Sequence, residues 1–313
     1  MEFRDPYKVM DLKALRCFWA TAKHGSLTQA GVELGISEAA ISQRLKSLES
    51  YLDSKLYETR GGRFKLTAAG HQTFDLAVLV FDQLQAFESS IHDNDQIANI
   101  VLACPESIIR YALPDVMHQF ARNHPLCEVK ILSRTPKDTI ELVKCNEADF
   151  GIIPDRILPK GISFLPWRTY AAYLIMPINH PVACGNQSNF QDIVNELKRK
   201  KYRFIANELD EHQNQKIAKG MQEAGLDYEV SLEVGSIDTV KLYVARGHGI
   251  AIVSGLCLTE IDKHSISAIK IPNGYCSDTL YGVILRDNKC VSRLVKTLLE
   301  ALGMMPIDEI CSR

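Results

Sequence analysis

The first part of the chain has apolar residues at helical spacing. They recur three, four and seven residues apart at Leu12, Leu15, Phe18, Trp19 and Ala22. This spacing places them on one face of a helix. Gly25 should end that helix, because glycine adopts the left-handed conformation found just past helix ends. Ser26 and Thr28 are both candidate N-caps for a second short helix that reaches about Leu34.

A third helix is expected after Gly35. Ser37 is suited to cap it, and its apolar stripe is formed by Ala40, Ile41, Leu45, Leu48 and Leu52. Two short helices joined by a tight turn that contains glycine are typical of a helix-turn-helix. The pattern therefore predicts a small DNA-binding fold.

A basic hairpin and a long helix follow. Residues 56–67 form two extended segments around Gly61-Gly62, as in a β-hairpin wing. Residues 67–94 then form one helical pattern with heptad-like spacing at Phe74, Val78, Phe81, Leu84 or Gln85, and Phe87 or Glu88. We interpret this stripe as a dimer contact. Packing on the chain's own helix-turn-helix is the alternative, and both can hold on different faces.

From residue 97 onward, short apolar runs alternate with helical patterns, which indicates an α/β fold with largely parallel strands. Strands are expected at 97–103, 129–132, 150–153, 173–176, 203–206, 229–233, 249–253 and 281–285. Helices are expected at 135–145, 190–199, 214–224 and 236–246. The polar residues 92–96 suit a linker between the two parts.

Charge is distributed unevenly between these parts. The 313-residue chain has a formal net charge of -2, so any nucleic-acid surface must be local. Residues 10–70 hold nine basic and six acidic side chains. A net charge of +3 in this segment has the sign that a DNA-facing surface requires.

Several classes of protein are disfavoured by the sequence. No run reaches the roughly 18 apolar residues of a membrane span, and the N-terminal residues do not resemble a signal peptide. A cytoplasmic protein is therefore expected. The nine cysteines form no Cys-x-x-Cys pair, which argues against a disulfide framework and a zinc ribbon. We expect no metal and no cofactor.

An enzyme is also not expected. The chain has no phosphate-binding loop, nucleophile elbow or His-Glu-x-x-His helix. Two alternatives stay open at this point. One is a helix-turn-helix fused to a catalytic α/β domain, and the other is an architectural DNA-binding protein whose second part only oligomerises.

The N-terminal segment resembles LysR-type transcriptional regulators. The matching positions are Leu15, Phe18, Ala22, Gly25-Ser26, Ala30, Leu34, Ser37, Ile41-Ser42, Leu45, Leu48-Glu49, Leu56, Arg60, Leu66-Thr67 and Gly70. The resemblance implies a winged helix-turn-helix (10–66), a linker and dimerisation helix (67–94) and an effector-binding domain (95–303). That domain would be a two-lobed α/β fold like a periplasmic binding protein. Its first lobe would span about 97–163 and 268–303, and its second about 164–267.

The same resemblance implies the partners. They are promoter DNA, a small-molecule effector, further copies in a homodimer or homotetramer, and RNA polymerase. In this arrangement the third helix lies in the major groove. Gln43 can pair with adenine, and Ala39 can meet a thymine methyl group. Glu38 can accept a hydrogen bond from cytosine, or it can simply favour the helix N-terminus. The predicted DNA-binding residues are Ser26, Thr28, Ser37, Glu38, Ala39, Ser42, Gln43, Arg44, Lys46, Arg60, Arg63 and Lys65. The basic members of this set, Arg44, Lys46, Arg60, Arg63 and Lys65, are expected to contact phosphates.

Effector-binding residues are expected in the loops at the strand ends that face the cleft between the lobes. The candidates are Cys104, Glu106, Ser107, Thr135, Asp155, Asn207, Glu208, Ser236, Asp238 and Ser254. Ser107 and Thr135 are the strongest pair. The sulfur-metabolite-sensing branch of the family is weakly resembled by Arg110-Tyr111-Ala112-Leu113-Pro114, Thr135-Pro136 and Ala148-Asp149-Phe150. The threonine-rich first loop of that branch is replaced here by Cys104-Pro105-Glu106-Ser107. Glu106 would repel sulfate, which favours a cation-bearing ligand or a different mode of sensing.

Cys104 supports a rival hypothesis. A thiol at a helix N-terminus can have a lowered pKa and can sense oxidants. The regulator would then respond to redox state in place of a small-molecule effector.

Overall fold

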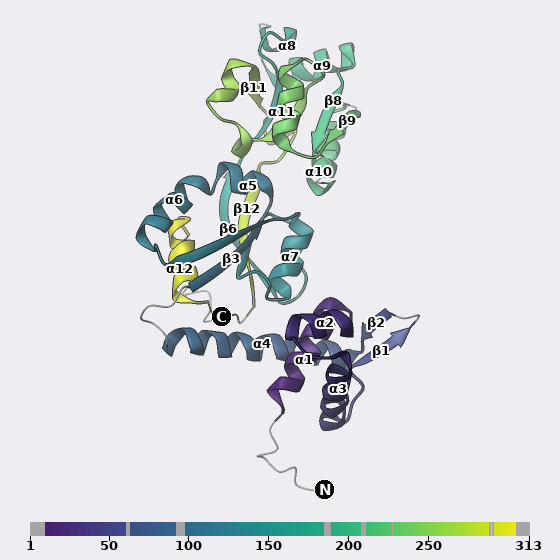
Figure 1. The fold of residues 1–313 in the computed structure, drawn as a ribbon. Helices are drawn as coiled ribbons and strands as arrows, with labels where there is room; N and C mark the ends of the chain where they lie inside the picture. The colour runs from purple at the N-terminus through teal and green to yellow at the C-terminus, as the bar shows by residue number, and fades with distance from the viewer. Residues whose placement is uncertain are drawn as a thin grey trace. The chain divides into compact units, whose positions relative to one another are not determined.

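The chain forms two compact units in the computed structural model (Figure 1). The structure describes residues 10–60, 63–91, 98–184, 189–207, 211–226, 228–287, 289 and 291–304. One unit comprises Met1–Asp95 with Asn288–Ser292, and the other comprises Gln96–Asp287 with Arg293–Arg313. The first unit is helical with one hairpin, and the second has mixed α and β structure, so the predicted fold class is confirmed.

The first unit begins with the three predicted helices, α1 (Leu12–His24), α2 (Leu27–Leu34) and α3 (Glu38–Leu52). Ser26 caps α2, because its hydroxyl oxygen accepts a hydrogen bond from the backbone N–H of Gln29. Ser37 caps α3 in the same way through Ala40. Gly25 and Gly35 have φ of 62° and 66°, the left-handed conformation that ends the two preceding helices.

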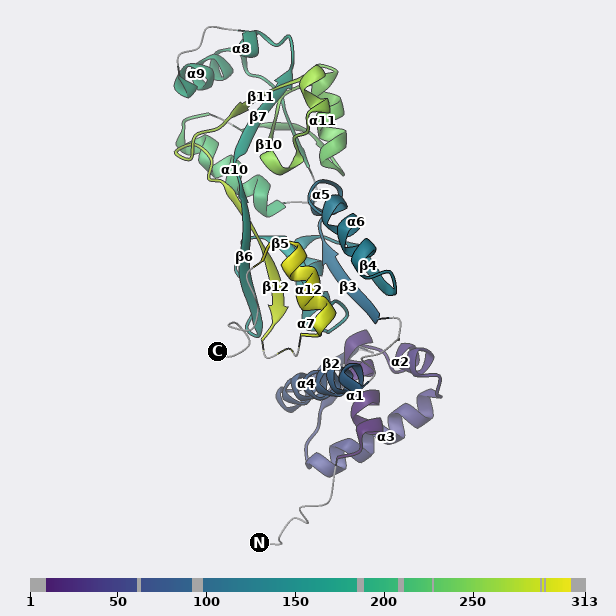
Figure 2. The same ribbon diagram turned by 90° about the vertical axis from the view of Figure 1, so that its left-hand side faces the viewer.

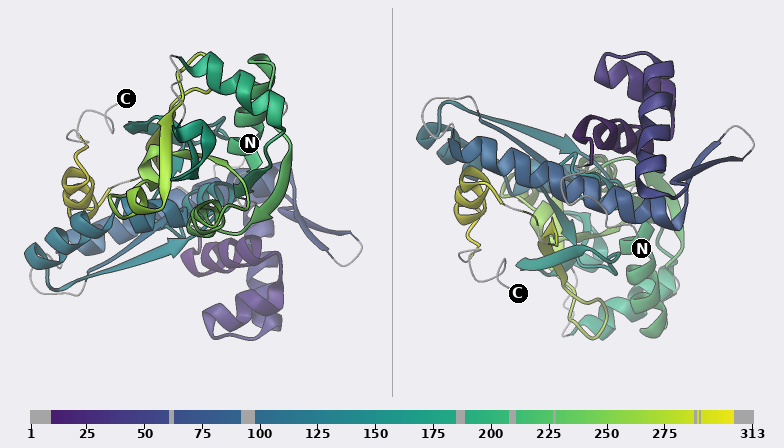
Figure 3. Two further views of the ribbon diagram at one scale, coloured as in Figure 1. Left: turned by 90° about the horizontal axis from the view of Figure 1, so that it is seen from above. Right: turned by 90° about the horizontal axis from the view of Figure 1, so that it is seen from below.

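The hairpin and the long helix complete this unit. Strand β1 (Tyr57–Arg60) pairs antiparallel with β2 (Arg63–Leu66), and α4 (Ala68–Ile91) follows. The hairpin projects from the helices (Figure 3). Phe18, Ile41, Leu45 and Leu56 are fully buried in one core among the helices, and Phe74 and Phe81 of α4 pack against that core.

Gly70 permits the close packing of α4 on the segment between α3 and β1. The hydroxyl of Thr67 accepts a hydrogen bond from the N–H of Gly70 at 3.0 Å and donates one to the carbonyl of Lys55 at 2.6 Å. A Cβ on Gly70 would lie 1.9 Å from the carbonyl oxygen of Leu56. Only glycine fits here without displacement of the backbone.

Replacing Gly70 with alanine should therefore destabilise the first unit by about 1–3 kcal/mol, the usual cost of overpacking. Helix propensity alone would predict that the free energy of unfolding rises by about 1 kcal/mol. The sign of the measured change therefore shows whether overpacking or helix propensity dominates. The measurement is urea unfolding followed by circular dichroism. Gly274→Ala is the matched control, because a Cβ there meets nothing within 4 Å; an increase in stability for Gly70→Ala would contradict the packing.

The second unit contains two lobes, which we define by their sheets. The first lobe has a five-stranded sheet in the order β4-β3-β5-β12-β6. Helices α6 and α12 cover one face of this sheet and α7 the other (Figures 1 and 2). Its elements are β3 (Ala98–Cys104), α5 (Glu106–Tyr111), α6 (Pro114–Asn123), β4 (Cys127–Ser133), α7 (Pro136–Lys144), β5 (Phe150–Pro154), β6 (Ile162–Tyr170), β12 (Thr279–Arg286) and α12 (Arg293–Ala301).

The second lobe has a three-stranded sheet in the order β10-β7-β11 and a parallel pair, β8-β9. Its strands are β7 (Ala172–Pro177), β8 (Phe204–Asn207), β9 (Val230–Val234), β10 (Ala251–Ser254) and β11 (Ile266–Lys270). Its helices are α8 (Pro181–Cys184), α9 (Phe190–Lys200), α10 (Glu211–Glu223) and α11 (Ile237–Ala245), with short 3-10 turns η1 (Gly255–Cys257) and η2 (Ile261–His264).

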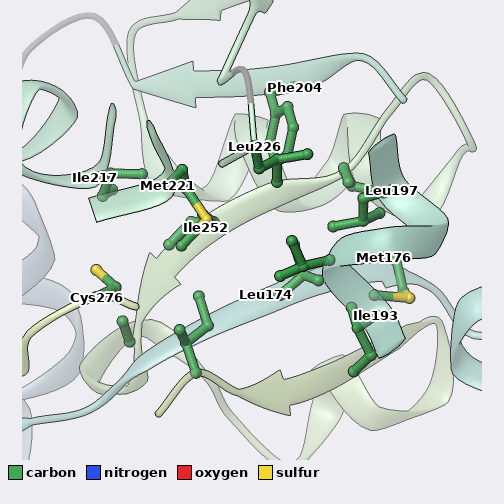
Figure 4. Packing of buried hydrophobic residues seen from close by; sticks show 14 of the residues in the cluster. Leu174, Met176, Ile193, Leu197, Phe204, Ile217, Met221, Leu226, Ile252 and Cys276 are labelled. Atoms are coloured by element: carbon green, nitrogen blue, oxygen red, sulfur yellow. The ribbon is translucent and has the colours of Figure 1, made fainter. Parts of the chain in front are cut away.

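Alternation along β7 organises the core of the second lobe. Leu174 and Met176 point to the face covered by α9 and α10, where they meet Ile193, Leu197 and Met221 (Figure 4). Ile175, between them in sequence, packs on the opposite face against α11. Successive strand side chains point to opposite faces, so one apolar strand is buried from both sides.

Two strands lie outside the sequence prediction. Strand β6 was missed because Pro166 interrupts its apolar pattern. A proline is tolerated there because β6 is an edge strand, and the register with β12 shifts at this point. Strand β11 was missed because it is short and only Ile266 of its five residues is buried. The lobe boundaries expected near residues 164 and 268 fall inside these strands. The structure places the crossings a few residues later, after Tyr170 and Lys270.

No helix in the part of the chain that the structure describes is long and apolar enough to cross a membrane.

Candidate functional site

Helix α3 has one buried and one exposed face. Ile41, Leu45 and Leu48 are buried. The predicted base-reading positions Glu38, Ala39 and Gln43 are exposed, as is the predicted phosphate contact Lys46, and Ser42 is half-buried. The amphipathic pattern thus places the candidate DNA-binding residues on the side of the helix that remains accessible to a duplex.

The start of α3 is tied to the start of α2. The Thr28 hydroxyl donates a hydrogen bond to Oε2 of Glu38 at 2.8 Å. The hydroxyl of Ser37 already caps α3, so Glu38 is not required as the cap. The contact orients the Glu38 carboxylate at the exposed end of α3, next to Thr28.

The predicted phosphate contacts lie in different environments. Lys65 is exposed on β2. Arg44 is half-buried and forms a hydrogen bond with the Cys17 thiol of α1; burial of that thiol raises its pKa above the ordinary value, and Arg44 opposes the rise. The backbones of Arg60 and Arg63 pair across the hairpin, while their side chains lie outside the described residues.

A cavity of about 280 Å³ lies between the lobes of the second unit. It opens where strands β3, β4, β8, β9 and β10 end and the next helices or turns begin, the usual ligand position in α/β folds. Seven of the ten candidate effector-binding residues line it: Glu106, Ser107, Thr135, Asn207, Ser236, Asp238 and Ser254. Ionisable and amide groups that were not among the predicted effector-binding residues also line it: Arg110, Tyr111, Arg134, Asp138 and Asn214.

Helix caps shape both walls of the cavity. On the first lobe, the hydroxyl of Thr135 accepts a hydrogen bond from the N–H of Asp138 at 3.2 Å and donates one to its carboxylate at 2.7 Å. On the second lobe, Ser236 caps α11 through the N–H of Thr239 at 3.2 Å. Each capping hydroxyl is therefore held at the cavity surface by its own helix.

One carboxylate connects the two walls. Arg110 Nη1 on α5 lies 2.8 Å from Oδ2 of Asp238 on α11, and the Tyr111 hydroxyl donates to Oδ1 of the same carboxylate at 2.5 Å. Burial raises the pKa of Tyr111 well above its ordinary value, and the bond to Asp238 raises it further. Tyr111 is therefore a neutral hydrogen-bond donor.

Arg110 and Tyr111 were missed because the prediction considered only the strand-end loop. They lie one helical turn beyond Glu106 and Ser107, so they share a helix face with two residues that were predicted. That i to i+4 spacing was the available signal.

Comparison with known proteins identifies the chain. Residues 96–305 match the family model of the LysR substrate binding domain, and residues 12–71 match that of the bacterial regulatory helix-turn-helix proteins of the lysR family. The chain belongs to the LysR family. It is a LysR-type transcriptional regulator with a DNA-binding unit and an effector-binding domain.

Individual relatives agree with this assignment. The LysR chain is 25% identical over 284 residues to the uncharacterised HTH-type transcriptional regulator YbhD of Escherichia coli strain K12, an alignment that covers 90% of this chain and 87% of YbhD. Among solved structures, a full-length OxyR variant from Pseudomonas aeruginosa aligns with a TM-score of 0.71 at 17% identity, over 96% of each chain. CbnR complexed with its target DNA aligns with a TM-score of 0.55 at 18% identity, over 94% of this chain and 99% of CbnR. The structural likenesses show the shared fold.

Two of the remaining three candidate effector residues, Cys104 and Asp155, do not line the cavity of this LysR regulator. Cys104 ends β3 with its side chain fully buried. The N–H of Asp155 continues the ladder with β12 by donating to the carbonyl of Leu280 at 2.7 Å, and its carboxylate is exposed outside the cavity. Glu208 lies outside the described residues.

The redox alternative needed a lowered pKa at Cys104, and this expectation is wrong. Burial raises the pKa of the Cys104 thiol to about 12. The desolvation that accompanies its position inside the sheet outweighs any favourable effect of the following helix. A thiolate at neutral pH is not available there. Within the described ranges, no three His, Cys, Asp or Glu side chains gather in a way that would hold a metal ion.

Proposed function

We propose that the protein binds partly palindromic promoter DNA as a dimer or tetramer, and that a small molecule in the interlobe cavity modulates this binding in the cytoplasm. The observation that supports this proposal best is the cavity itself, because it lies between two separately folded lobes and is lined by polar groups from both. A ligand that contacts both walls favours one relative placement of the lobes. The effector domain then acts as a binding module and not as an enzyme.

Helix α4 supports the proposed dimer. Phe74, Val78 and Phe81 pack within their own unit, so this part of the predicted stripe serves the monomer's core. Leu84 and Phe87, from the later part of the same stripe, are exposed on α4, as are Leu76 and Leu79. Exposed apolar surface along a helix is typical of a partner contact. Two paired α3 helices would read two half-sites, bend the DNA and alter contact with RNA polymerase.

The experiment that tests the proposal is selection of binding sites from random duplexes, followed by footprinting at two salt concentrations. We expect enriched sequences with dyad symmetry, a footprint in two parts, and binding that weakens steeply with salt. Absence of any enriched sequence would overturn the sequence-specific function. Symmetric enrichment with a single half-site footprint would overturn the dimer.

Gln43 and Lys65 should have different effects on DNA binding. Gln43→Ala removes a predicted base contact, so affinity for the selected site should fall about 5- to 150-fold while non-specific affinity changes little. Lys65→Gln removes a predicted phosphate contact, so all duplexes should weaken alike and the salt slope should fall by about one. Titrations of selected and scrambled duplexes at several salt concentrations measure both effects. Equal losses on both duplexes for Gln43→Ala would contradict the placement of α3 in the major groove.

A further inference from the structure

The side chain of Asp238 joins the lobes by two short contacts. It comes from the first turn of α11 in the second lobe, whereas its partners Arg110 and Tyr111 come from the last turn of α5 in the first. The distances are 2.8 Å to the guanidinium and 2.5 Å to the hydroxyl. Hydrogen bonds to an ionised carboxylate are stronger than those between neutral groups. The pair of contacts therefore stabilises one relative placement of the lobes.

Lys241 contacts the Asp238 carboxylate from within the second lobe. Its ammonium lies 3.5 Å from Oδ1 of Asp238 and 4.8 Å from the centre of the Tyr111 ring. The same ammonium donates to Oδ2 of Asp262 at 3.1 Å and to the carbonyl of Cys257 at 2.9 Å. Lys241 is thus fixed within the second lobe, and it lies under the contact between the lobes.

Both sides of the contact keep partners when the lobes separate. Asp238 retains Lys241 in its own lobe. Arg110 retains Glu106, whose carboxylate is 3.6 Å away on the preceding turn of α5. Neither charge is left alone, so breaking the contact avoids the large cost of an unpaired buried charge. Such a contact can open and close reversibly.

We propose that Asp238 is a positioning residue that sets the closure of the effector cavity, as an interlobe latch with Arg110 and Tyr111. This inference rests on the proposed role of the cavity in effector binding. All three latch residues line the cavity, so an occupant lies directly against the groups that hold the lobes together. A ligand whose contacts complement the latched placement favours closure, and one that competes for Arg110 or Tyr111 favours opening.

The test measures the distance between the lobes in the full-length chain without effector. Spin labels are attached through non-canonical amino acids that replace Arg122 on α6 and Lys263 on η2, both exposed, and pulsed electron resonance gives the distance distribution. Asp238→Asn removes the charge and Tyr111→Phe removes one hydroxyl. Each should shift the ratio of open to closed lobes about five- to tenfold, the effect of one partly exposed charge-assisted hydrogen bond.

Two further variants separate a latch from a general structural role. Glu196→Gln is the matched control, because Glu196 accepts from Arg199 at 2.9 Å within α9 and touches only the second lobe; its distribution should equal that of the parent. The double variant Asp238→Asn/Tyr111→Phe should shift the ratio by less than the product of the single shifts, since both remove one shared contact. Circular dichroism verifies that each variant is folded.

Unchanged distributions for both Asp238→Asn and Tyr111→Phe would overturn the latch, as would an equal shift for Glu196→Gln. If Asp238→Asn fails to fold, Tyr111→Phe alone decides, because it keeps the aromatic ring and leaves the Asp238 carboxylate in place. The footprinting experiment is independent of this one. A shifted distance with no enriched DNA sites would overturn the proposed function and leave the latch intact.

Discussion

Replacing Phe18 with alanine is expected to unfold the DNA-binding unit, with a loss of about 3–5 kcal/mol in its free energy of unfolding. Phe18 is fully buried at the centre of α1, among Leu15, Ile41 and Leu45. Its ring fills the space where three short helices meet, so alanine leaves a cavity that the rigid core cannot close. The expected loss is comparable to the whole stability of a small domain.

Calorimetry and site-specific DNA binding measure this effect. In the variant, the transition of the first unit should move to a much lower temperature while that of the second unit stays in place, because the chain forms two compact units. Binding to the selected site should be lost in parallel. Val32→Ala is the control, since Val32 is 81% exposed on α2 and should change stability by no more than about 0.5 kcal/mol. A loss below about 1 kcal/mol for Phe18→Ala would contradict the described core.

The second large effect is expected at Lys241. This side chain is buried on α11, where it meets the carboxylates of Asp262 and Asp238 and the carbonyl of Cys257. Lys241→Met keeps most of the length of the side chain and removes its charge, which leaves the Asp262 carboxylate without its cation while Asp238 keeps Arg110. Breaking a buried ion pair on one side costs about 3–5 kcal/mol. Denaturant unfolding of the second unit measures the loss.

The Lys241 effect should depend on pH. Burial tends to raise the pKa of Asp262, but hydrogen bonds from Thr259 and the contact with Lys241 outweigh it, and the pKa lies below the ordinary value of 3.8. A carboxyl group with a lowered folded-state pKa stabilises the fold above its unfolded pKa, and this contribution disappears as pH falls through the folded value. The parent should therefore lose stability below about pH 4.

Lys241→Met should make this loss smaller, because the variant lacks the cation that favours ionised Asp262. Urea unfolding between about pH 3 and 7 for both chains measures the difference. The control is Lys263→Met, since Lys263 pairs with Glu260 on an exposed surface, where ion pairs contribute little. An equal pH dependence for Lys241→Met and the parent would show that Lys241 does not stabilise the ionised form.

Local chemistry made much of the fold predictable from the sequence. A hydroxyl residue just before a segment with helical apolar spacing commonly caps the helix. The structure has such caps at Ser26, Ser37, Thr135 and Ser236. The loops that follow parallel strands lie at one edge of the sheet in α/β folds. Seven of the ten residues predicted on that basis therefore line the cavity.

The failures arose where distant parts of the chain decide the environment. The burial of Cys104 depends on the strands beside it and on the helices that cover the sheet, and a local motif contains none of that information. Asp155 follows a strand like the other candidates, but its backbone pairing with β12 continues past the strand end. The contact of Tyr111 with Asp238 joins positions 127 residues apart, a separation that no periodicity reports.

The hydrogen bond between Thr28 and Glu38 has a consequence for how operator preference evolves. The carboxylate that begins α3 is oriented by a hydroxyl on α2, so in the proposed placement of α3 a base facing Glu38 would be read by a pair of side chains and not by one. A substitution at either position would change the orientation or remove the acceptor, so single changes should weaken recognition before they redirect it. A new preference at that base would then require both residues to change together, which would tie the diversification of this regulator's targets to coupled substitutions on two neighbouring helices.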